Sequence, residues 1–258
     1  MNKVLITGAS SGIGKELAHC FAKDQHHLII TARSEKELLA LKEELEKKYS
    51  ITVDLFPTDL SQIENVQKLT RWVAENGWSV THLINNAGFG DVGLFEYTQW
   101  TKNQQMIELN ITALTALCHH YVPLMKENGF GRILNVASTA AFQPGPTMAV
   151  YFATKSYVLH FSEALNGELK GSGISVTALC PGPTQTQFAK AAGFNDNGIF
   201  DSTKKFPSAK EVAEFGYQSL LKQKSVAIHG LKNYVLANTS RIFPRDMVVA
   251  VAKWMMKG

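Results

Sequence analysis

Short β-type runs alternate with helical patterns along this chain of 258 residues, and that alternation limits the folds open to it. The β-type runs occupy residues 4–7, 27–32, 52–56, 82–85, 132–137 and 175–180. The stretches between them carry apolar residues at helical spacing, such as Leu38, Leu41 and Leu45. Strands separated by helices pair in parallel through right-handed crossovers, so the pattern predicts an α/β fold with a doubly wound parallel sheet. We expect about seven strands, with helices on both faces and ligands beyond the carboxyl ends of the strands.

Composition and charge narrow the classes of partner. Apolar residues make up 45% of the chain, which is enough for a substantial core. No repeat or low-complexity linker divides the sequence, so we expect a single domain over residues 1–258. The formal net charge is +4, with Lys and Arg spread along the chain, and this distribution does not favour nucleic-acid binding.

Cysteines, histidines and apolar runs bear on metal binding and location. Cys20, Cys118 and Cys180 lie far apart, and the eight histidines form no group with metal-ligand spacing, so we expect free thiols and no metal site. The chain begins directly with a β-type run, which leaves no room for a signal peptide. No apolar run approaches the roughly 18 residues of a membrane span. These features predict a cytoplasmic protein without a membrane span.

A glycine-rich turn, TGASSGIG at residues 7–14, joins the first predicted strand to the first predicted helix. Glycines there allow a tight turn and let backbone N–H groups approach a pyrophosphate, while the helix N-terminus supplies partial positive charge. The turn therefore predicts a dinucleotide site, with contacts from Gly8, Ser10, Ser11, Gly12, Ile13 and Gly14.

The end of the second predicted strand indicates which dinucleotide binds. NAD sites usually place an acid there, but this chain has Ala32 followed by Arg33. A guanidinium can hold a ribose 2′-phosphate through paired, charge-assisted hydrogen bonds, and Ser10 and Ser11 can add hydroxyl contacts. Arg33 could instead be a solvated residue at a helix start. We expect NADP(H), with NAD(H) as the alternative.

The spacing of the turn glycines resembles the T-G-x-x-x-G-x-G pattern of the classical short-chain dehydrogenase/reductase (SDR) family. The resemblance covers about the first 190 residues and implies a Rossmann-type fold. Three further segments are similar to cofactor-site motifs of that family. The resemblance implies contacts near the adenine from Asp59 and Leu60, in the cleft from Asn86, Ala87 and Gly88, and near the nicotinamide from Pro181, Gly182 and Thr184.

Residues 151–155, YFATK, place a tyrosine and a lysine four positions apart, which is one helical face. Lys155 can put positive charge near Tyr151 and also reach the nicotinamide ribose. A free tyrosine titrates near pH 10, and lowering its pKa by about three units requires roughly 4 kcal/mol in favour of phenolate. The ammonium and the oxidised nicotinamide are the charges that we expect to supply this.

Ser138 follows the strand-like run 132–137, where its hydroxyl can hold a substrate oxygen. Asn110 falls in the predicted helix before that run, and its position matches the family's Asn that supports a water relay to the lysine. The resemblance thus implies a catalytic set of Asn110, Ser138, Tyr151 and Lys155. Substrate contacts are predicted from Ser138, Phe142, Gln143, Tyr151 and Phe188.

Two regions interrupt the alternation. Residues 185–207 are predicted to form a substrate lid, with a plain structural loop as the alternative. Residues 230–258 form a C-terminal extension in which Pro244 can start a helix. We expect that helix to pack on the domain or on a second subunit, and membrane-surface contact is the alternative.

Together these features predict an NADP(H)-dependent oxidoreductase that interconverts a carbonyl and an alcohol, with Tyr151 as general acid/base. The aromatic-rich lid favours an apolar or medium-sized carbonyl substrate. The alternatives are an NAD-linked alcohol dehydrogenase and a non-catalytic dinucleotide sensor on the same scaffold. The resemblance also implies a homodimer or homotetramer, assembled through long helices at about 99–127 and 149–170.

Overall fold

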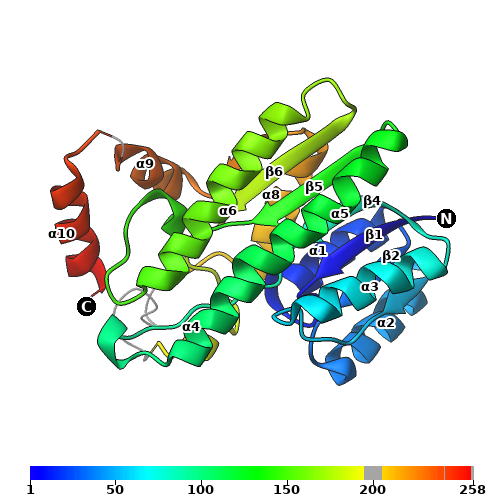
Figure 1. Ribbon diagram of the computed structural model, residues 1–258, viewed down its shortest axis with the longest axis horizontal. Coiled ribbons are helices and arrows are strands. Elements are labelled where there is room, and N and C mark those ends of the chain that lie inside the picture. Colours follow the sequence, from blue (N-terminus) through cyan, green and yellow to red (C-terminus); the bar gives the residue numbers. More distant parts are fainter. Residues whose placement is uncertain (195–204, 241, 257–258) are drawn as a thin grey trace.

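The computed structural model describes residues 1–194, 205–240 and 242–256 (Figure 1). In this part of the chain the strands form one parallel sheet in the order β3-β2-β1-β4-β5-β6-β7. The strands are β1 (Asn2–Thr7), β2 (Leu28–Thr31), β3 (Val53–Leu55), β4 (Ser79–Asn85), β5 (Gly131–Val136), β6 (Ile174–Cys180) and β7 (Val226–Ile228). The predicted doubly wound fold is confirmed; β7 is the strand for which the sequence analysis named no run.

Two layers of helices cover the sheet, and the strand pattern explains the split. Leu5 of β1 lies in one hydrophobic cluster, whereas its neighbours Val4 and Ile6 lie in the other. Successive strand side chains point to opposite faces, so each strand contributes to both cores. The cluster with Leu5 includes residues of α3 (Ile63–Glu75), α5 (Leu114–Glu127) and α6 (Ala149–Glu168). The cluster with Ile6 includes residues of α1 (Gly12–Lys23), α2 (Glu35–Tyr49) and α8 (Ala209–Leu221).

The long helix expected at about 99–127 is interrupted by a π-helical segment. It runs as α4 (Trp100–Ile107), a π-helical segment η2 (Glu108–Ala113) and then α5. A π-bulge widens the helix locally and is frequent at functional sites. Asn110 lies inside this segment and is buried, with 1% of its surface exposed.

The two irregular regions lie beyond the carboxyl ends of the strands. In the predicted lid, α7 (Phe188–Ala192) is described, and the Gln185 N–H donates to the Pro207 carbonyl at 3.0 Å. Residues 195–204 of that lid lie outside the described residues. In the C-terminal extension, α9 (Leu231–Thr239) and α10 (Arg245–Met256) lie at the end of the molecule remote from the N-terminus (Figure 1). In the described ranges, no helix is long and apolar enough to cross a bilayer.

Candidate active site

One cavity of about 980 Å³ lies along the carboxyl edge of the sheet, where the fold predicts a ligand. Its lining runs from the glycine turn and Arg33, past Ser138, Tyr151 and Lys155, to the C-terminal helices. This volume is at the upper end of the range for small-molecule sites. The cavity therefore brings together the two groups of residues predicted separately, those for the dinucleotide and those for catalysis.

The glycine turn has the geometry of an anion cradle. Gly8 and Gly12 have φ of +65° and +56°, conformations that residues with a side chain rarely adopt. Helix α1 begins at Gly12 with no side-chain cap and no acidic residue in its first turn. Its first N–H groups therefore remain available to an anion. Ser10, Ser11, Gly12 and Ile13 line the cavity, whereas Gly14 is buried behind the turn.

Hydrogen bonds from two side chains fix the turn to the end of β4. The Thr7 hydroxyl accepts from the N–H groups of Asn86 and Ala87, both at 3.0 Å. The Asn86 amide donates to the carbonyls of Thr7 and Gly8, also at 3.0 Å each. Asn86, Ala87 and Gly88 line the cavity as predicted for the cleft. The turn is thus held open as part of the sheet edge rather than as a free loop.

Arg33 occupies the entrance at the end of β2. Its side chain is exposed, lines the cavity and makes no ion pair with a described residue. Asp59 and Leu60 line the same end of the cavity. The Asp59 carboxylate accepts from the Ser61 N–H at 3.0 Å, which orients the chain before α3. This arrangement has room for an adenosine group and offers a free guanidinium beside it.

Tyr151 and Ser138 meet at the wall of the cavity. Both side chains line the cavity, and Tyr151 is 8% exposed. Burial raises the pKa of Tyr151 to about 12, although the Ser138 hydroxyl opposes that rise. The direction is opposite to the expected lowering of the pKa, because burial outweighs the stabilisation of the phenolate by neighbouring groups of the chain. The chain alone therefore keeps the phenol protonated at neutral pH.

Lys155 lies one helical turn from Tyr151 on α6 and is 6% exposed. Its Nζ donates to the Val136 carbonyl at 2.8 Å and lies 5.9 Å from the centre of the Tyr151 ring. Burial lowers the pKa of Lys155 to about 8, and the neighbouring Cys180 acts in the opposite direction. The ammonium is thus held at the end of β5, next to the cavity.

Asn110 adjoins this group from the π-helical segment. Its Nδ2 donates to the Phe89 carbonyl and to the Thr154 hydroxyl, both at 3.0 Å, and its Oδ1 accepts from the Phe89 N–H at 3.2 Å. A Cβ built on Gly88 would lie 2.9 Å from Asn110 Oδ1 and 3.4 Å from Lys155 Nζ. The Asn110 amide oxygen and the Lys155 ammonium thus both lie close against Gly88, where a larger residue would not fit.

The predicted substrate and nicotinamide residues do not all lie in the cavity. Gln143, Phe188, Pro181, Gly182 and Thr184 line it. Phe142 does not belong to the described lining; it packs instead against the core beneath α6. Phe142 is the last residue of the 3₁₀ turn η3 (Thr139–Phe142), and position along the chain could not indicate which way its ring points.

Sequence reasoning missed much of the apolar lining. Phe188 contacts Tyr151 with ring centres 5.3 Å apart, and Met148 and Phe152 pack in the same cluster. Further lining side chains come from Phe89, Phe194, Leu236, Phe243, Met247 and Val251. The only available signal was the apolar stripe at helical spacing near the C-terminus, which by itself indicates packing and not a site.

Known proteins resemble this chain in sequence and in structure. The family model for short chain dehydrogenases matches residues 2–196. A sulfoacetaldehyde reductase of Chromohalobacter salexigens is 34% identical over 201 residues, which are 77% of this chain and 79% of that protein. A short-chain dehydrogenase from Sphingobium yanoikuyae, solved in complex with NADPH, is 31% identical with a TM-score of 0.83, covering 94% of both chains.

A second solved structure is the bulky-bulky ketone specific alcohol dehydrogenase from Comamonas testosteroni. It is 29% identical with a TM-score of 0.80, covering 94% of this chain and 92% of that one. The matched segment in the family model contains the glycine turn, Ser138, Tyr151 and Lys155, all of which line the one cavity. The chain therefore belongs to the short-chain dehydrogenase/reductase family and is an oxidoreductase of carbonyl or alcohol substrates that uses a nicotinamide dinucleotide.

Proposed function

We propose that this protein is an NADP(H)-dependent carbonyl reductase or alcohol dehydrogenase in which Tyr151 is the general acid/base. The observation that carries the proposal is the meeting of the Ser138 and Tyr151 hydroxyls at the cavity wall, next to the buried Lys155. Two hydroxyl groups that converge in this way can hold one substrate oxygen. The cradle of positive-φ glycines and the uncapped start of α1 fit a pyrophosphate at the other end of the same cavity.

When bound, the nicotinamide supplies a hydride to the carbonyl carbon, or accepts one from the alcohol in the reverse direction. Ser138 and Tyr151 donate hydrogen bonds to the carbonyl oxygen and polarise it. As negative charge develops on that oxygen, Tyr151 transfers its phenolic proton there, so the substrate gains one hydride and one proton. Burial keeps the pKa of Tyr151 near 12, so the acid form required for reduction is the one present at neutral pH.

Proton return to Tyr151 is assigned to Lys155 and Asn110. Their polar atoms, Asn110 Oδ1 and Lys155 Nζ, both lie close to Gly88, so a water molecule bound by the two groups would connect them. Oxidation of an alcohol uses the same groups in reverse and requires the phenolate. Because burial disfavours that phenolate, we expect oxidation to accelerate with rising pH more steeply than reduction does.

The preference for NADP(H) rests on Arg33. Its guanidinium lies at the cavity entrance without an ion-pair partner among the described residues, and it follows Ala32, which occupies the position where NAD sites usually carry an acid. A ribose 2′-phosphate would give that guanidinium a charge-assisted, paired interaction. Ser10 and Ser11, which line the same part of the cavity, can add hydroxyl contacts.

Titration of NADPH and NADH into wild type and Arg33→Ala tests the cofactor assignment. We expect Arg33→Ala to weaken NADPH binding about 10- to 100-fold and to change NADH binding little, because only the 2′-phosphate interaction is removed. Equal binding of both dinucleotides to wild type would overturn the preference for NADP(H).

A panel of ketones and aldehydes then tests the reaction. Tyr151→Phe removes only the hydroxyl, and we expect turnover to fall about 10²- to 10⁴-fold while NADPH binding is retained. Retained turnover in Tyr151→Phe would refute its role as acid. Tight NADPH binding by wild type with no turnover of any carbonyl compound would favour a dinucleotide sensor.

A reducing compartment such as the cytoplasm suits the three free cysteines.

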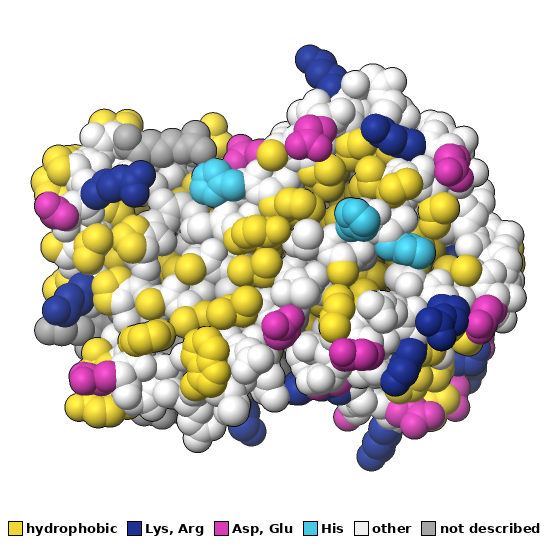
Figure 2. Space-filling view, viewed as in Figure 1, with side chains coloured by type: hydrophobic (Ala, Val, Ile, Leu, Met, Phe, Trp, Pro, Cys, Tyr) yellow, Lys and Arg dark blue, Asp and Glu magenta, His cyan; other side chains and the backbone are white. Residues whose placement is uncertain are grey.

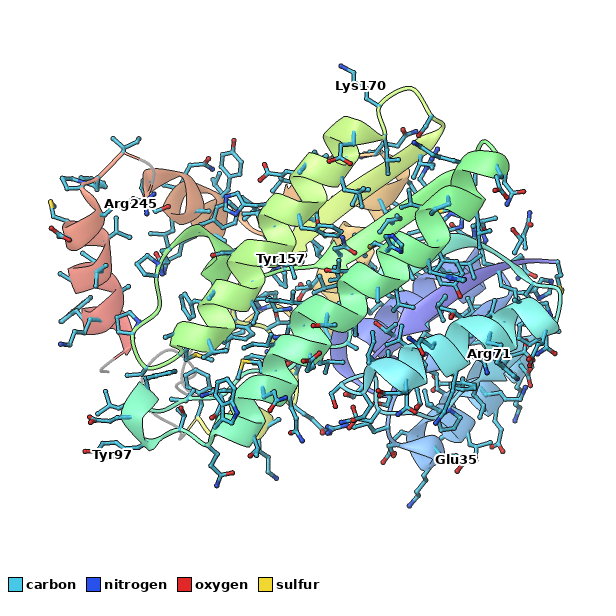
Figure 3. All side chains as sticks on the ribbon, viewed as in Figure 1. Glu35, Arg71, Tyr97, Tyr157, Lys170 and Arg245 are labelled. Carbon is cyan, nitrogen blue, oxygen red and sulfur yellow. The ribbon has the colours of Figure 1, made fainter. Side chains whose placement is uncertain are left out.

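We also propose that the protein self-associates through α5 and α6. Hydrophobic side chains gather over these helices in the middle of the face in Figure 2. Tyr157, which Figure 3 labels on α6, is 38% exposed and stacks on Phe161 with ring centres 5.7 Å apart. We expect a dimer or tetramer in sedimentation experiments, dissociated by Tyr157→Glu; a monomeric wild type would overturn this proposal.

A further inference from the structure

The cavity extends beyond the catalytic residues to a wall formed by the C-terminal helices. α9, α10 and the segment between them contribute six apolar residues to the lining. They are Leu236, Ala237, Phe243, Met247, Val248 and Val251. The family model ends at residue 196, so this wall belongs to the part of the chain that the family pattern does not cover.

Four of the six side chains of this wall are exposed although they are apolar. Leu236, Phe243, Met247 and Val251 are 46%, 53%, 51% and 53% exposed, and each of them lines the cavity. Grouped exposed apolar side chains in a concave site are typical of a surface that a ligand covers. A ligand that fills the cavity would remove this area from water, at about 25 cal/mol per Å² of apolar surface.

The wall on the catalytic side is apolar as well. Met148, Tyr151 and Phe152 form one hydrophobic cluster, with Phe188 and Phe194 packed against it. Phe188 also lies against the ring of Tyr151. A carbonyl group held by the catalytic hydroxyls therefore lies between two apolar surfaces, the Phe152 cluster and the α9–α10 wall.

Charge is concentrated at the nucleotide end of the cavity. Among the described lining residues, the charged side chains are Arg33, Glu37, Asp59 and Lys155. The first three lie at the adenosine end, and Lys155 donates to the Val136 carbonyl. Two polar side chains of the far wall already have partners, because Ser240 Oγ donates to the Phe142 carbonyl and Asn233 Nδ2 donates to the His229 carbonyl.

We propose that α9 and α10 form a distal apolar subsite and that the substrate is an uncharged carbonyl compound with a long or bulky hydrocarbon substituent. This inference rests on the proposed carbonyl reductase function and adds the substrate class. The substituent covers the α9–α10 wall while the carbonyl oxygen contacts Ser138 and Tyr151. A short aldehyde would leave that wall exposed to water. An anionic substituent would place a charge against the wall, where no described side chain of opposite charge can pair with it.

A homologous series of methyl ketones from 2-butanone to 2-undecanone, assayed with NADPH, measures the subsite directly. We expect kcat/KM to rise about threefold to fourfold per methylene until the wall is covered, because each buried methylene contributes about 0.8 kcal/mol. A keto acid as long as the best ketone, with a carboxylate at the far end, is expected to lose most of that gain. Equal kcat/KM along the series, or a preference for the keto acid, would overturn the inference.

Two pairs of variants test whether the wall is what makes kcat/KM depend on the length of the ketone. Phe243→Ala and Met247→Ala remove cavity-lining area, whereas Ile242→Ala and Val249→Ala change exposed apolar residues of the same region that do not line the cavity. We expect the first pair to lower kcat/KM about tenfold or more for the longest ketone and by a much smaller factor for 2-butanone, so that the chain-length dependence is lost. The control pair should keep the wild-type chain-length profile, and all four should keep the wild-type affinity for NADPH.

Calorimetric binding of 2-undecanol to the NADP⁺ complex provides a readout that does not depend on turnover. Binding that weakens in Phe243→Ala but not in Ile242→Ala supports the subsite even if the assays find no turnover, in which case only the proposed reaction fails. Absence of binding, or equal weakening in both variants, would overturn the subsite while leaving the reductase reaction testable with other ketones.

Discussion

The two ends of the cavity are built from different material. At the nucleotide end the surface is mostly backbone, held by Gly8, Gly14 and the buried side chain of Thr7 at the edges of β1 and β4. At the far end the surface consists of side chains on α9 and α10, such as Phe243 and Met247, which are each more than half exposed. One end is part of the core of the sheet, and the other is an outer layer.

The difference indicates how specificity can change on this fold. Substitutions at the nucleotide end disturb packed backbone and buried hydrogen bonds, so we expect them to cost stability and cofactor binding together. Substitutions on α9 and α10 alter the surface that a substrate meets, with little effect on the core. The following predictions test whether the two ends are separable in this way, beginning with the largest expected change in stability.

Gly14→Ala should have the largest effect. A Cβ at Gly14 would lie 2.3 Å from the Gly8 carbonyl oxygen and 2.3 Å from Asn86 Nδ2, and the backbone must move to relieve that contact. We expect the free energy of unfolding to fall by about 3 kcal/mol and NADPH binding to weaken at least tenfold. Urea unfolding and fluorescence titration measure the two quantities.

Gly167→Ala is the matched control for that change. Gly167 lies in α6, and a Cβ at this position would have no described atom outside its own helical turn within 4 Å, so the extra methyl group meets open space. We expect Gly167→Ala to stabilise the protein by up to about 1 kcal/mol, because alanine favours the helix. If both variants are destabilised equally, the tight packing behind the turn is not what requires glycine at position 14.

Lys155→Met is expected to raise stability and to abolish most of the activity. Burial lowers the pKa of Lys155 from 10.5 to about 8, which corresponds to about 3 kcal/mol against the folded state while both states carry the ammonium. The lost hydrogen bond to Val136 offsets about 1 kcal/mol. We therefore expect the variant to be about 2 kcal/mol more stable than wild type at pH 7 and almost inactive.

The pH dependence gives this prediction its sign. Below pH 8 the folded and unfolded states both bind the proton, and the full cost of burying the charge is present. Between pH 8 and 10.5 the folded state releases the proton first, so wild type gains stability relative to Lys155→Met as the pH rises. Chemical denaturation at pH 7 and at about pH 10 measures this change; a constant difference between the two proteins would contradict it.

Thr7→Val compared with Ser240→Ala contrasts hydrogen bonds at the two ends. Thr7→Val keeps the side-chain shape but leaves the Ala87 N–H without its acceptor and removes one of the two acceptors of the Asn86 N–H, so we expect a loss of about 1.5 kcal/mol. Ser240→Ala removes hydroxyl donation to the Phe142 carbonyl at a partly exposed position, and we expect a loss below about 0.5 kcal/mol. Similar losses of unfolding free energy in the two variants, measured by thermal unfolding, would show that both ends of the cavity contribute equally to stability.

Much of the fold and of the cofactor end is local in the sequence. The alternation of apolar patterns predicted six strands within a few residues of their bounds, because each pattern reports one element's own buried face. The strand β7, Val226–Ile228, was not among the six predicted strands. The glycine turn and the Tyr151–Lys155 pair were also predictable, since a tight turn and one helical face depend on near neighbours along the chain.

Only the tertiary structure decided the properties that depend on what surrounds a side chain. Burial of Tyr151 raises its pKa, and Phe142 packs against the core rather than lining the cavity. The wall of α9 and α10 reaches the site because the chain folds back onto η3, which lies about 100 residues earlier in the sequence. There Ser240 Oγ donates to the Phe142 carbonyl. The sequence by itself determined the local conformations and the order of the motifs; desolvation and long-range packing, which no local pattern encodes, set the electrostatics of the site and the shape of its substrate end.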